Sequence, residues 1–331
     1  MKKAITFLSG ILVAIAGWII LQKFEIHGWQ DLQRSSRDRF SRGSPLEPSP
    51  TSANLPPSRS AGSIRVATFN IQVFGDSKAK KPHVMDILAR IVRQFDVVAI
   101  QEVCSKSQDL IPNFLDLVNA GGRHYDYLVG PRLGRNDSKE QYVFIYDMAT
   151  VEVDRSQLYT VADPDDLLHW EPLVAWFRVR GPPPDQAFTF SLVNVHVEPD
   201  EAQQELEVLA DVYRGVRNDG RQEDDVIILG NLNADFEHLG RLGQISGMTS
   251  AIRGLPTNTR GTHQLDNLVF HGLATAEYTG RSGVFDFLRE YNLTLEEALE
   301  VSDHLPVWAE FSVYEGGQPG RLAERPDSKT R

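Results

Sequence analysis

The 331-residue chain contains a single cysteine, Cys104. One thiol excludes an intramolecular disulfide, so the chain is not a small disulfide-stapled domain. The compartment stays open, because exported proteins without disulfides are common. At this length, and with 41% hydrophobic residues, the chain can bury one large core or two small ones.

The body of the chain also lacks an excess of positive charge. Residues 63–314 carry a net charge of −16, against +4 for residues 1–62 and +1 for residues 315–331, within a formal total of −11. A body this acidic does not attract nucleic acid nonspecifically. It can still hydrolyse phosphate esters if divalent cations neutralise its active site.

Long apolar runs are scarce, and the longest is "AITFLSGILVAIAGWIIL", Ala4 to Leu21. Its length is near the lower limit for crossing a bilayer, so residues 1–22 are predicted to form an uncleaved membrane anchor. The alternative is a cleaved signal peptide, for which Ala14-Ile15-Ala16 has the small-x-small form. Basic residues flank both sides and do not fix the orientation. We expect the globular part on the extracytoplasmic side, or secreted if the segment is cleaved.

Composition divides the remainder into three segments. Residues 23–63 include a Pro/Ser-rich stretch without a periodic apolar face, which predicts a flexible tether. Residues 64–314 are predicted to form one globular domain, and residues 315–331 a disordered tail.

Short apolar runs of strand length dominate the predicted domain. They are "IRVATFNI", "DVVAIQEV", "YVFIYD", "LVAWFRV", "FTFSLVNVHV", "DVIILG", "DNLVF" and "PVWAEFSV". Two segments, 83–94 and 201–217, place apolar residues at helical spacing. Many strands with a few amphipathic helices predict an α+β fold, in which two packed sheets are flanked by helices.

Polar side chains cluster where these strands begin or end. Asn70, Glu102, His196 and Asn231 end predicted strands, Asp266 begins one, and Asp303-His304 directly precedes another. Each position alone is explained by turn chemistry or by a structural histidine. Their repetition at strand ends predicts a site on one rim of the scaffold.

The ordered motifs "ATFNI", "VVAIQEV", "KEQYVFIY", "VNVHVEP", "GNLNAD", "LDNLVF" and "SDHLPV" resemble those of the endonuclease/exonuclease/phosphatase superfamily, and within it the deoxyribonuclease I branch. The likeness covers Ile64 to Val313. It implies a four-layer α/β sandwich of two mixed β-sheets flanked by helices. It also implies metal-dependent hydrolysis of phosphate esters at the mouth between the sheets.

The resemblance also implies a role for each polar residue. Glu102 would be the principal metal ligand, supported by Asn70, with Asp303 as a second metal-binding carboxylate. His196 and His304 would be the active-site histidines, oriented by Glu140 and Asp266 respectively. Asn233 would contact phosphate, and Asn231 stands at a position that helps to hold the metal and the attacking water.

Phosphodiester hydrolysis requires these residue types for physical reasons. A phosphate anion repels hydroxide, so hard oxygen ligands must hold a cation such as Mg²⁺ against it, and Mn²⁺ or Ca²⁺ can substitute. One histidine must deprotonate water, and another group must stabilise or protonate the leaving alkoxide. A carboxylate behind each imidazole fixes its tautomer and raises its basicity.

One departure from the family pattern affects the chemistry itself. The family has Gly-Asp-x-Asn where this chain has Gly230-Asn231-Leu232-Asn233. An amide oxygen can ligate a cation and orient water, but it brings no charge and accepts no proton. Asp235 could compensate, although a cap or turn role is the more common one for such a residue. We therefore expect metal-dependent but reduced activity.

Two other departures affect substrate choice. Trp170 stands where the deoxyribonuclease branch has an arginine that contacts phosphate, and Ser138 stands where it has a tyrosine that packs against DNA. Both weaken the case for double-stranded DNA. The loop 130–139 keeps Arg132, Arg135 and Lys139, which either meet a phosphate backbone or form a plain solvated loop. Cys104, directly after "QEV", is expected to be buried and inert.

Three hypotheses follow from the sequence. The leading one is a membrane-anchored, Mg²⁺-dependent phosphodiesterase acting on nucleic acid, DNA in preference to RNA, with no protein partner. The second is a phosphatase or phosphodiesterase for a lipid headgroup or small phosphoester. The third is a catalytically impaired binding or scaffold protein of the same fold, supported directly only by Asn231.

Overall fold

A computed structural model of the chain describes residues 60, 62–135 and 139–317. The apolar segment Ala4–Leu21, nearly all of the predicted tether, Ser138 and most of the predicted tail lie outside the described residues, and the predictions made for them stay predictions. Within the described part of the chain, no helix is long and apolar enough to cross a membrane.

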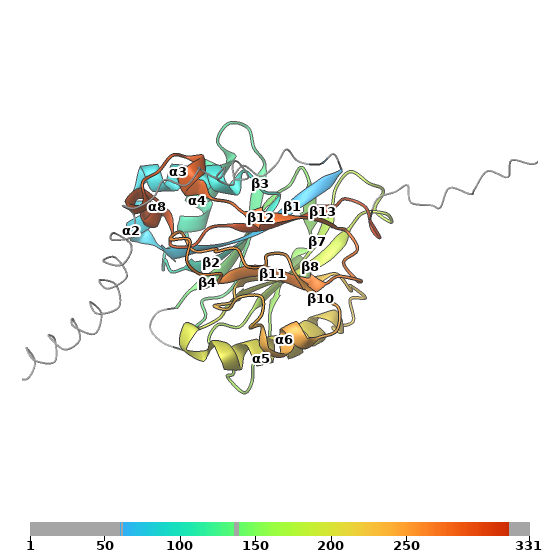
Figure 1. Cartoon of the computed structure of the whole chain (residues 1–331). Helices are drawn as coiled ribbons and strands as arrows, with labels where there is room; N and C mark the ends of the chain where they lie inside the picture. Colours follow the sequence, from blue (N-terminus) through green and yellow to red (C-terminus); the bar gives the residue numbers. More distant parts are fainter. Residues whose placement is uncertain (1–59, 61, 136–138, 318–331) are drawn as a thin grey trace, which may run out of the picture. The chain divides into compact units, whose positions relative to one another are not determined.

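Two mixed β-sheets form the centre of the domain (Figure 1). The first sheet has six strands in the order β12 (Tyr278–Val284), β13 (Val307–Ser312), β1 (Ser63–Phe74), β2 (Val97–Val103), β4 (Gln141–Asp147) and β3 (Tyr125–Val129). The second has the order β10 (Met248–Ser250), β11 (Asp266–His271), β9 (Val226–Asn231), β8 (Thr189–His196), β7 (Leu173–Val179) and β5 (Val151–Val153), and β6 (Tyr159–Thr160) also pairs with β7. In each sheet only the central pair, β1–β2 or β8–β9, is parallel.

Helices cover the outer face of each sheet. Helices α3 (Pro82–Val92), α4 (Leu110–Asn119) and α8 (Leu295–Val301), with the short α2 (Asp76–Ala79) and α7 (Phe287–Glu290), lie on the side of the first sheet. Helices α5 (Ala202–Arg217) and α6 (Gly240–Gln244) lie on the side of the second (Figure 1). The predicted four-layer α/β sandwich is confirmed.

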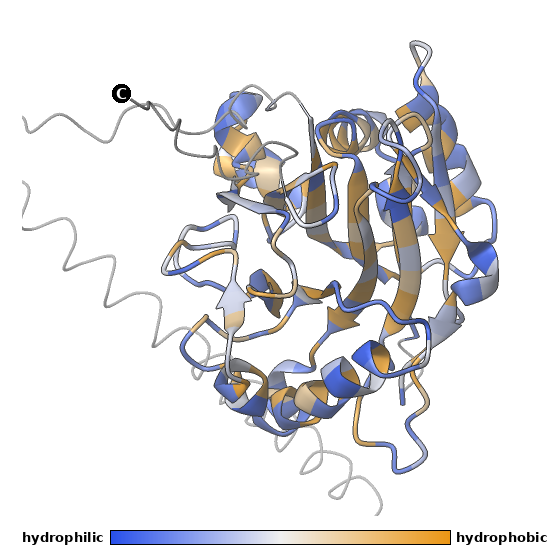
Figure 2. Ribbon diagram, turned by 90° about the vertical axis from the view of Figure 1, so that its right-hand side faces the viewer, coloured by the Kyte–Doolittle hydropathy of each residue, from blue (hydrophilic) through white to orange (hydrophobic). Residues whose placement is uncertain are grey.

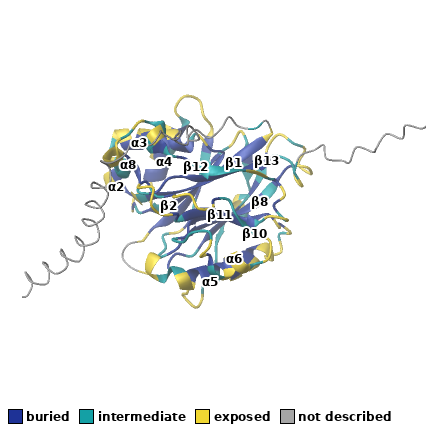
Figure 3. Cartoon of the chain, viewed as in Figure 1, coloured by how far each residue is buried: buried dark blue, intermediate teal, exposed yellow. Residues whose placement is uncertain are grey.

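Burial follows the same layers. Apolar residues concentrate on the strands and the inner faces of the helices (Figure 2), and the exposed residues lie mainly on outer helix faces and loops (Figure 3). Three apolar clusters separate the four layers, and the cluster between the sheets contains aromatic residues such as Phe177 and Phe311. Burial of apolar area at each of these interfaces is the main force that holds the sandwich together.

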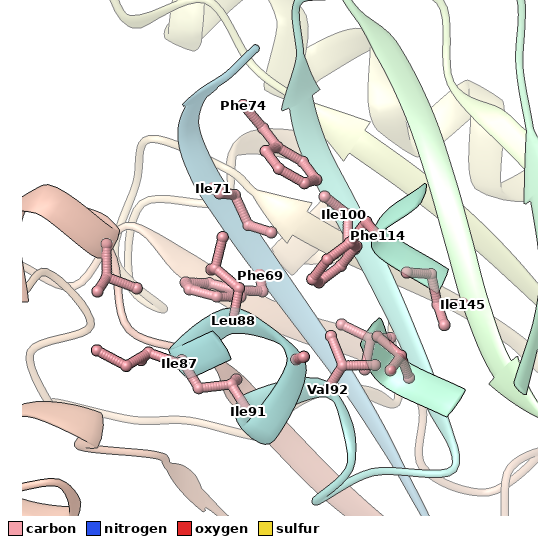
Figure 4. Close-up of a cluster of buried hydrophobic side chains, with 14 of the residues drawn as sticks. Phe69, Ile71, Phe74, Ile87, Leu88, Ile91, Val92, Ile100, Phe114 and Ile145 are labelled. Carbon is pink, nitrogen blue, oxygen red and sulfur yellow. The ribbon is translucent and has the colours of Figure 1, made fainter. Parts of the chain in front are cut away.

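Helix α3 shows why the sequence forms these elements. Pro82 stands in its first turn, where the missing N–H costs nothing. Its inward face then packs Leu88 and Val92 against Phe69 on β1 and Ile100 on β2, as Figure 4 shows. Both helices predicted from helical spacing are present, α3 and α5, with bounds shifted by no more than two residues.

A buried polar link joins the two sheets next to the site. Gln101 at the end of β2 donates a hydrogen bond from Nε2 to Asn194 Oδ1 on β8, at 2.6 Å. Asn194 Nδ2 in turn donates to the carbonyls of Ile100 and Val143. Both side chains are fully buried and paired, so these two strand-end residues position the sheets and do not take part in the chemistry.

The register of the central strands brings the predicted site residues to one edge. Asn70 pairs with Gln101 across β1–β2, and Asn231 lies between His196 on β8 and Asp266 on β11. Gly230 lets β9 approach β8 closely, because a Cβ there would lie 1.9 Å from the Val195 carbonyl oxygen at φ +153°. The ends of both parallel pairs therefore meet at this rim.

Candidate active site

Strained backbone surrounds the predicted metal ligands. Val73, Glu102 and Asn233 all have positive φ, of 46°, 62° and 46°. Both β1 and β2 shift register at this end, between Asn70 and Phe74 and between Ile100 and Val103. Positive φ is costly for a β-branched residue such as Val73, and bulges at strand ends redirect side chains. This backbone conformation directs the Glu102 carboxylate toward the Val73 amide, which donates to Oε2 at 2.8 Å.

Glu102 and Asn70 form one oxygen-rich unit. Asn70 Nδ2 donates to Glu102 Oε1 at 2.9 Å, which leaves Asn70 Oδ1 buried without a hydrogen-bond partner in the described structure. Burial alone would raise the pKa of Glu102, but His196 and the Val73 and Asn70 donors outweigh it and hold that pKa below its usual value. An ionised carboxylate beside an unpartnered amide oxygen suits a hard divalent cation.

The first histidine–carboxylate pair joins β8 to the residue before β4. His196 Nδ1 lies 2.7 Å from Glu140 Oε1, and both side chains are buried. An ionised carboxylate only accepts hydrogen bonds, so the proton resides on Nδ1 and Nε2 is left free for chemistry. That Nε2 lies 3.8 Å from Glu102 Oε1. Burial would lower the pKa of His196, but Glu140 raises it above its usual value.

The second pair joins β11 to the loop before β13. His304 Nδ1 lies 2.8 Å from Asp266 Oδ2, and Thr257 Oγ1 donates to the same oxygen at 2.7 Å. Burial would lower the pKa of His304, but the Asp266 carboxylate raises it to about 9. His304 Nε2 lies 3.9 Å from Asp303 Oδ1. Both pairs thus present a free imidazole edge beside an acidic residue.

Asn231 is buried between the two pairs but makes a local contact. Its Oδ1 accepts the Asn233 amide at 2.9 Å, and Asn233 Nδ2 donates to the Val197 carbonyl at 2.6 Å. Asp235 does not move in to replace the missing charge. It accepts from the Glu237 amide and from His238 in an exposed turn, which is the turn role weighed for it above.

Trp170 occupies a position that the sequence did not explain. Its indole ring stacks on the His196 imidazole, with centroids 4.4 Å apart and an interplanar angle of 2°. Tyr142 adds a second restraint, because its hydroxyl accepts the His196 backbone N–H at 2.8 Å and donates to the Trp170 carbonyl at 3.3 Å. The residue that replaces the family's arginine therefore holds a catalytic candidate in place.

Three further residues of the site were not predicted from the sequence. Gln72 Nε2 donates to Asp303 Oδ2 at 3.0 Å, Lys78 Nζ donates to the Val301 carbonyl at 2.6 Å, and Thr257 supports Asp266. Lys78 is buried, and burial lowers its pKa to about 8. No motif marked these residues, since each acts through a contact made by the fold.

The basic loop is tied to the protein itself. Arg132 donates to the carbonyls of Cys104, Ser105 and Lys139, and Arg135 pairs with Asp166 and Glu201. Both arginines therefore hold the loop to the rest of the protein, a role that the sequence did not predict. Cys104 is half-buried, and burial raises the pKa of its thiol to about 12, in accord with an inert cysteine.

Comparisons with known proteins agree with the fold and with the family resemblance. A model described as "Endonuclease/Exonuclease/phosphatase family" matches residues 67–304. Deoxyribonuclease gamma of Rattus norvegicus is 33% identical over 262 residues, covering 74% of this chain and 83% of that protein. Deoxyribonuclease-1-like 1 of Sus scrofa is 35% identical over 264 residues, covering 76% and 82%. The solved structure of truncated Caenorhabditis elegans TDP2 matches with a TM-score of 0.52 at 15% identity, covering 76% of this chain and 98% of that one.

Proposed function

Because the chain belongs to the endonuclease/exonuclease/phosphatase family, we propose that it is a metal-dependent phosphodiesterase that hydrolyses nucleic acid, DNA in preference to RNA. One observation carries the proposal. Two buried histidines, each held through Nδ1 by a buried carboxylate, present Nε2 beside Glu102 and Asp303. The relatives' names, deoxyribonuclease gamma and deoxyribonuclease-1-like 1, support DNA as the substrate.

The ligand set fits a hard cation. Glu102, Asn70 and Asp303 would hold Mg²⁺, or Mn²⁺ or Ca²⁺ in its place, and Asn231 would add a neutral oxygen. Two features of this chain support the fit, the unpartnered Asn70 oxygen and the lowered pKa of Glu102. When bound, the cation would neutralise a phosphate oxygen and favour attack on phosphorus.

The protein's own groups supply the proton transfers. One imidazole Nε2 takes a proton from the attacking water, and the other supplies one to the leaving alkoxide. Glu140 and Asp266 hold the two rings through Nδ1, so both proton transfers take place at Nε2. Asn233 would contact the phosphate from a position two residues after the end of β9, where its side-chain amide donates to the Val197 carbonyl.

A binding protein of the same fold is the second candidate, and Asn231 favours it. The amide cannot carry the negative charge of the family's aspartate, and its oxygen already accepts the Asn233 amide. Loss of a well-placed acid or base costs about 10²–10⁴-fold in rate. The two intact histidine–carboxylate pairs favour a slowed enzyme over an inactive one.

Nicking of supercoiled plasmid by the full-length chain tests the proposal. We expect nicking in Mg²⁺, its loss in chelator, and a loss of about 10²–10⁴-fold with His196→Ala. The matched control is His83→Ala, an exposed histidine paired with Glu300, which keeps the activity. A contaminating nuclease would ignore both substitutions.

Phospholipid vesicles assayed in parallel separate the lipid-headgroup alternative. Release of headgroup or phosphate while plasmid stays intact would replace the proposed substrate. Binding of DNA without nicking, unchanged by His196→Ala, would favour the binding protein.

A further inference from the structure

A second group of acidic residues lies at the end of the sheets opposite the candidate active site. Asp225 directly precedes β9, whose other end carries Asn231, so the two positions are about 20 Å apart at strand geometry. Glu277 directly precedes β12, and Glu315 follows β13. One ligand oxygen from each of these three residues lies within 4.8 Å of the others.

The buried members of this group lack the partners that buried charges require. Asp225 and Glu277 are each 1% exposed, yet Asp225 Oδ1 and Glu277 Oε2 have no hydrogen-bond donor within the described residues. The side chains that act most strongly on Asp225 are Glu277, Thr275, Glu223 and Glu315, and none of them is a cation. Burial and the neighbouring Glu277 raise the pKa of Asp225 to about 9. Charged carboxylates buried without donors or cations are costly, so such groups are protonated, paired with a cation or bound to metal.

An independent observation comes from a neutral group. The Thr275 hydroxyl is also buried and lies close enough to the Asp225 carboxyl to lower its pKa, but it makes no hydrogen bond of good geometry in the described structure. A hydroxyl that faces carboxylates would normally donate to one of them. Left unpaired beside them, its oxygen is available as a further ligand.

The remaining polar atoms of the group are already held in place. Glu277 Oε1 accepts the Gly316 amide, and Glu315 Oε2 accepts the Thr189 amide at 3.2 Å. Glu223 accepts the Asp225 amide on one carboxylate oxygen and the Trp176 indole N–H on the other. The fixed oxygens leave Asp225 Oδ1 and Glu277 Oε2 free. Glu315 is exposed and gives the group an opening to solvent.

We propose that Asp225, Glu277 and Glu315, together with Thr275, form a binding site for a hard divalent cation, calcium before magnesium. Calcium accepts six to eight oxygen ligands in irregular geometry and takes carboxylates and neutral oxygens together, whereas magnesium demands a near-ideal octahedron. The ion would join β9 of the second sheet to the strands β12 and β13 of the first. It is thus a structural clamp, separate from the candidate active site.

Terbium luminescence tests the site directly, because Tb³⁺ takes the same oxygen ligands as Ca²⁺ and is excited by nearby tryptophan. Trp176 is suitably placed, with its Nε1 donating to Glu223 at 2.9 Å. The full-length chain is used with Glu102→Gln, which disables the other predicted metal site. We expect saturable emission that excess Ca²⁺ displaces and that Asp225→Asn removes.

Two further variants keep the test decisive. Glu315→Gln changes an exposed side chain, so it reports on the site even if Asp225→Asn folds poorly, and it should weaken Tb³⁺ binding at least tenfold. Glu296→Gln, an exposed acid on α8, is the charge-matched control and leaves the emission unchanged. Emission that survives both site variants, or its absence from the Glu102→Gln protein, overturns the proposal.

Thermal unfolding distinguishes a cation bound by these carboxylates from a proton shared between them. With Ca²⁺ at a hundred times its dissociation constant, the Tm should exceed that in chelator by roughly 5 °C or more, and Glu315→Gln should shrink this difference. An equal Tm in calcium and in chelator, with a Tm that rises as the pH is lowered, would mean that Asp225 and Glu277 share a proton instead. That result would overturn the metal site.

Discussion

The buried carboxylates at the two ends of strand β9 have opposite kinds of partner and opposite pKa shifts. At the Asn231 end, Glu140 and Asp266 each hold a histidine, and the pKa of Glu102 lies below its usual value. At the Asp225 end, Asp225 and Glu277 face each other without a cation, and the pKa of Asp225 rises to about 9. The same residue type is thus stabilised as an anion by the protein at one end, and at the other it requires a group from outside.

The comparison separates catalytic carboxylates from structural ones by their partners. A carboxylate with an imidazole partner controls a proton that can move during a reaction. A carboxylate surrounded by amides and other acids affects mainly stability and metal binding. Substitutions at the two ends should therefore change different quantities, activity at the Asn231 end and stability at the Asp225 end.

The largest effect is expected for the second histidine pair. His304→Ala should lower the rate of plasmid nicking by about 10²–10⁴-fold, because it removes one of the two proton-transferring groups. Asp266→Asn should cost nearly as much, since the amide no longer fixes the tautomer of His304. The double variant should lose little more than His304→Ala alone. If the losses of the two single variants add fully in the double variant, Asp266 does not act through His304.

A smaller effect is expected for the aromatic support of His196. Trp170→Leu should lower kcat about tenfold, because a stacked pair contributes up to about 1.5 kcal/mol and about 1.4 kcal/mol corresponds to tenfold in rate. KM should change less than kcat. The pH dependence of kcat should shift as well, because it reports the pKa of the His196 imidazole.

Trp176→Leu is the matched control for this substitution. Trp176 lies on β7, and its indole contacts Glu223 at the Asp225 end, so its loss should leave kcat unchanged. Equal losses of kcat in the two variants would remove the positioning role of Trp170.

The smallest effect is expected on stability, at Glu205, a buried acid on helix α5. Glu205 accepts the His169 amide at 3.0 Å, and burial raises its pKa from 4.5 to about 7. The folded state therefore binds the proton more tightly than the unfolded state, and this contribution to stability is lost as the pH rises from 4.5 through about 7.

Glu205→Gln removes this titration and retains the acceptor oxygen. At pH 8 the Tm of the variant should exceed that of the wild type by about 2–4 °C, the shift that about 1 kcal/mol produces in a domain of this size. At pH 5 the advantage should vanish or reverse. Parallel Tm curves for the two proteins between pH 5 and 8 would mean that Glu205 does not titrate in this range.

The elements predicted from the sequence are those with a strong local pattern. The eight apolar runs all form strands, and segments 83–94 and 201–217 form α3 and α5. Strand β12 was not predicted, because "YTGRSGV" has two glycines and little apolar content, and only pairing with β13 makes it a strand. Helix α4 was missed despite its buried Leu110 and Phe114, because Pro112 interrupts the apolar pattern.

Only the site residues that belong to sequence motifs could be predicted. The strand-end residues and their order indicated which side chains to consider, and the family resemblance supplied the pairing of Glu140 with His196. Contacts made through the fold could not be predicted from spacing. The stacking of Trp170 on His196 and the support of Asp303 by Gln72 join residues from separate elements. The unpartnered carboxylates of Asp225 and Glu277 also meet only in the folded chain.

The most direct test of the central claim is the nicking rate of Asn231→Asp relative to the wild type, measured with the full-length chain in Mg²⁺ and in Mn²⁺. We propose that the chain keeps the reaction and has lost one charge. The wild type should therefore nick slowly and the variant about 10²-fold faster, and chelator should abolish nicking by both. Equal rates, or no nicking by either protein with either metal, would contradict it.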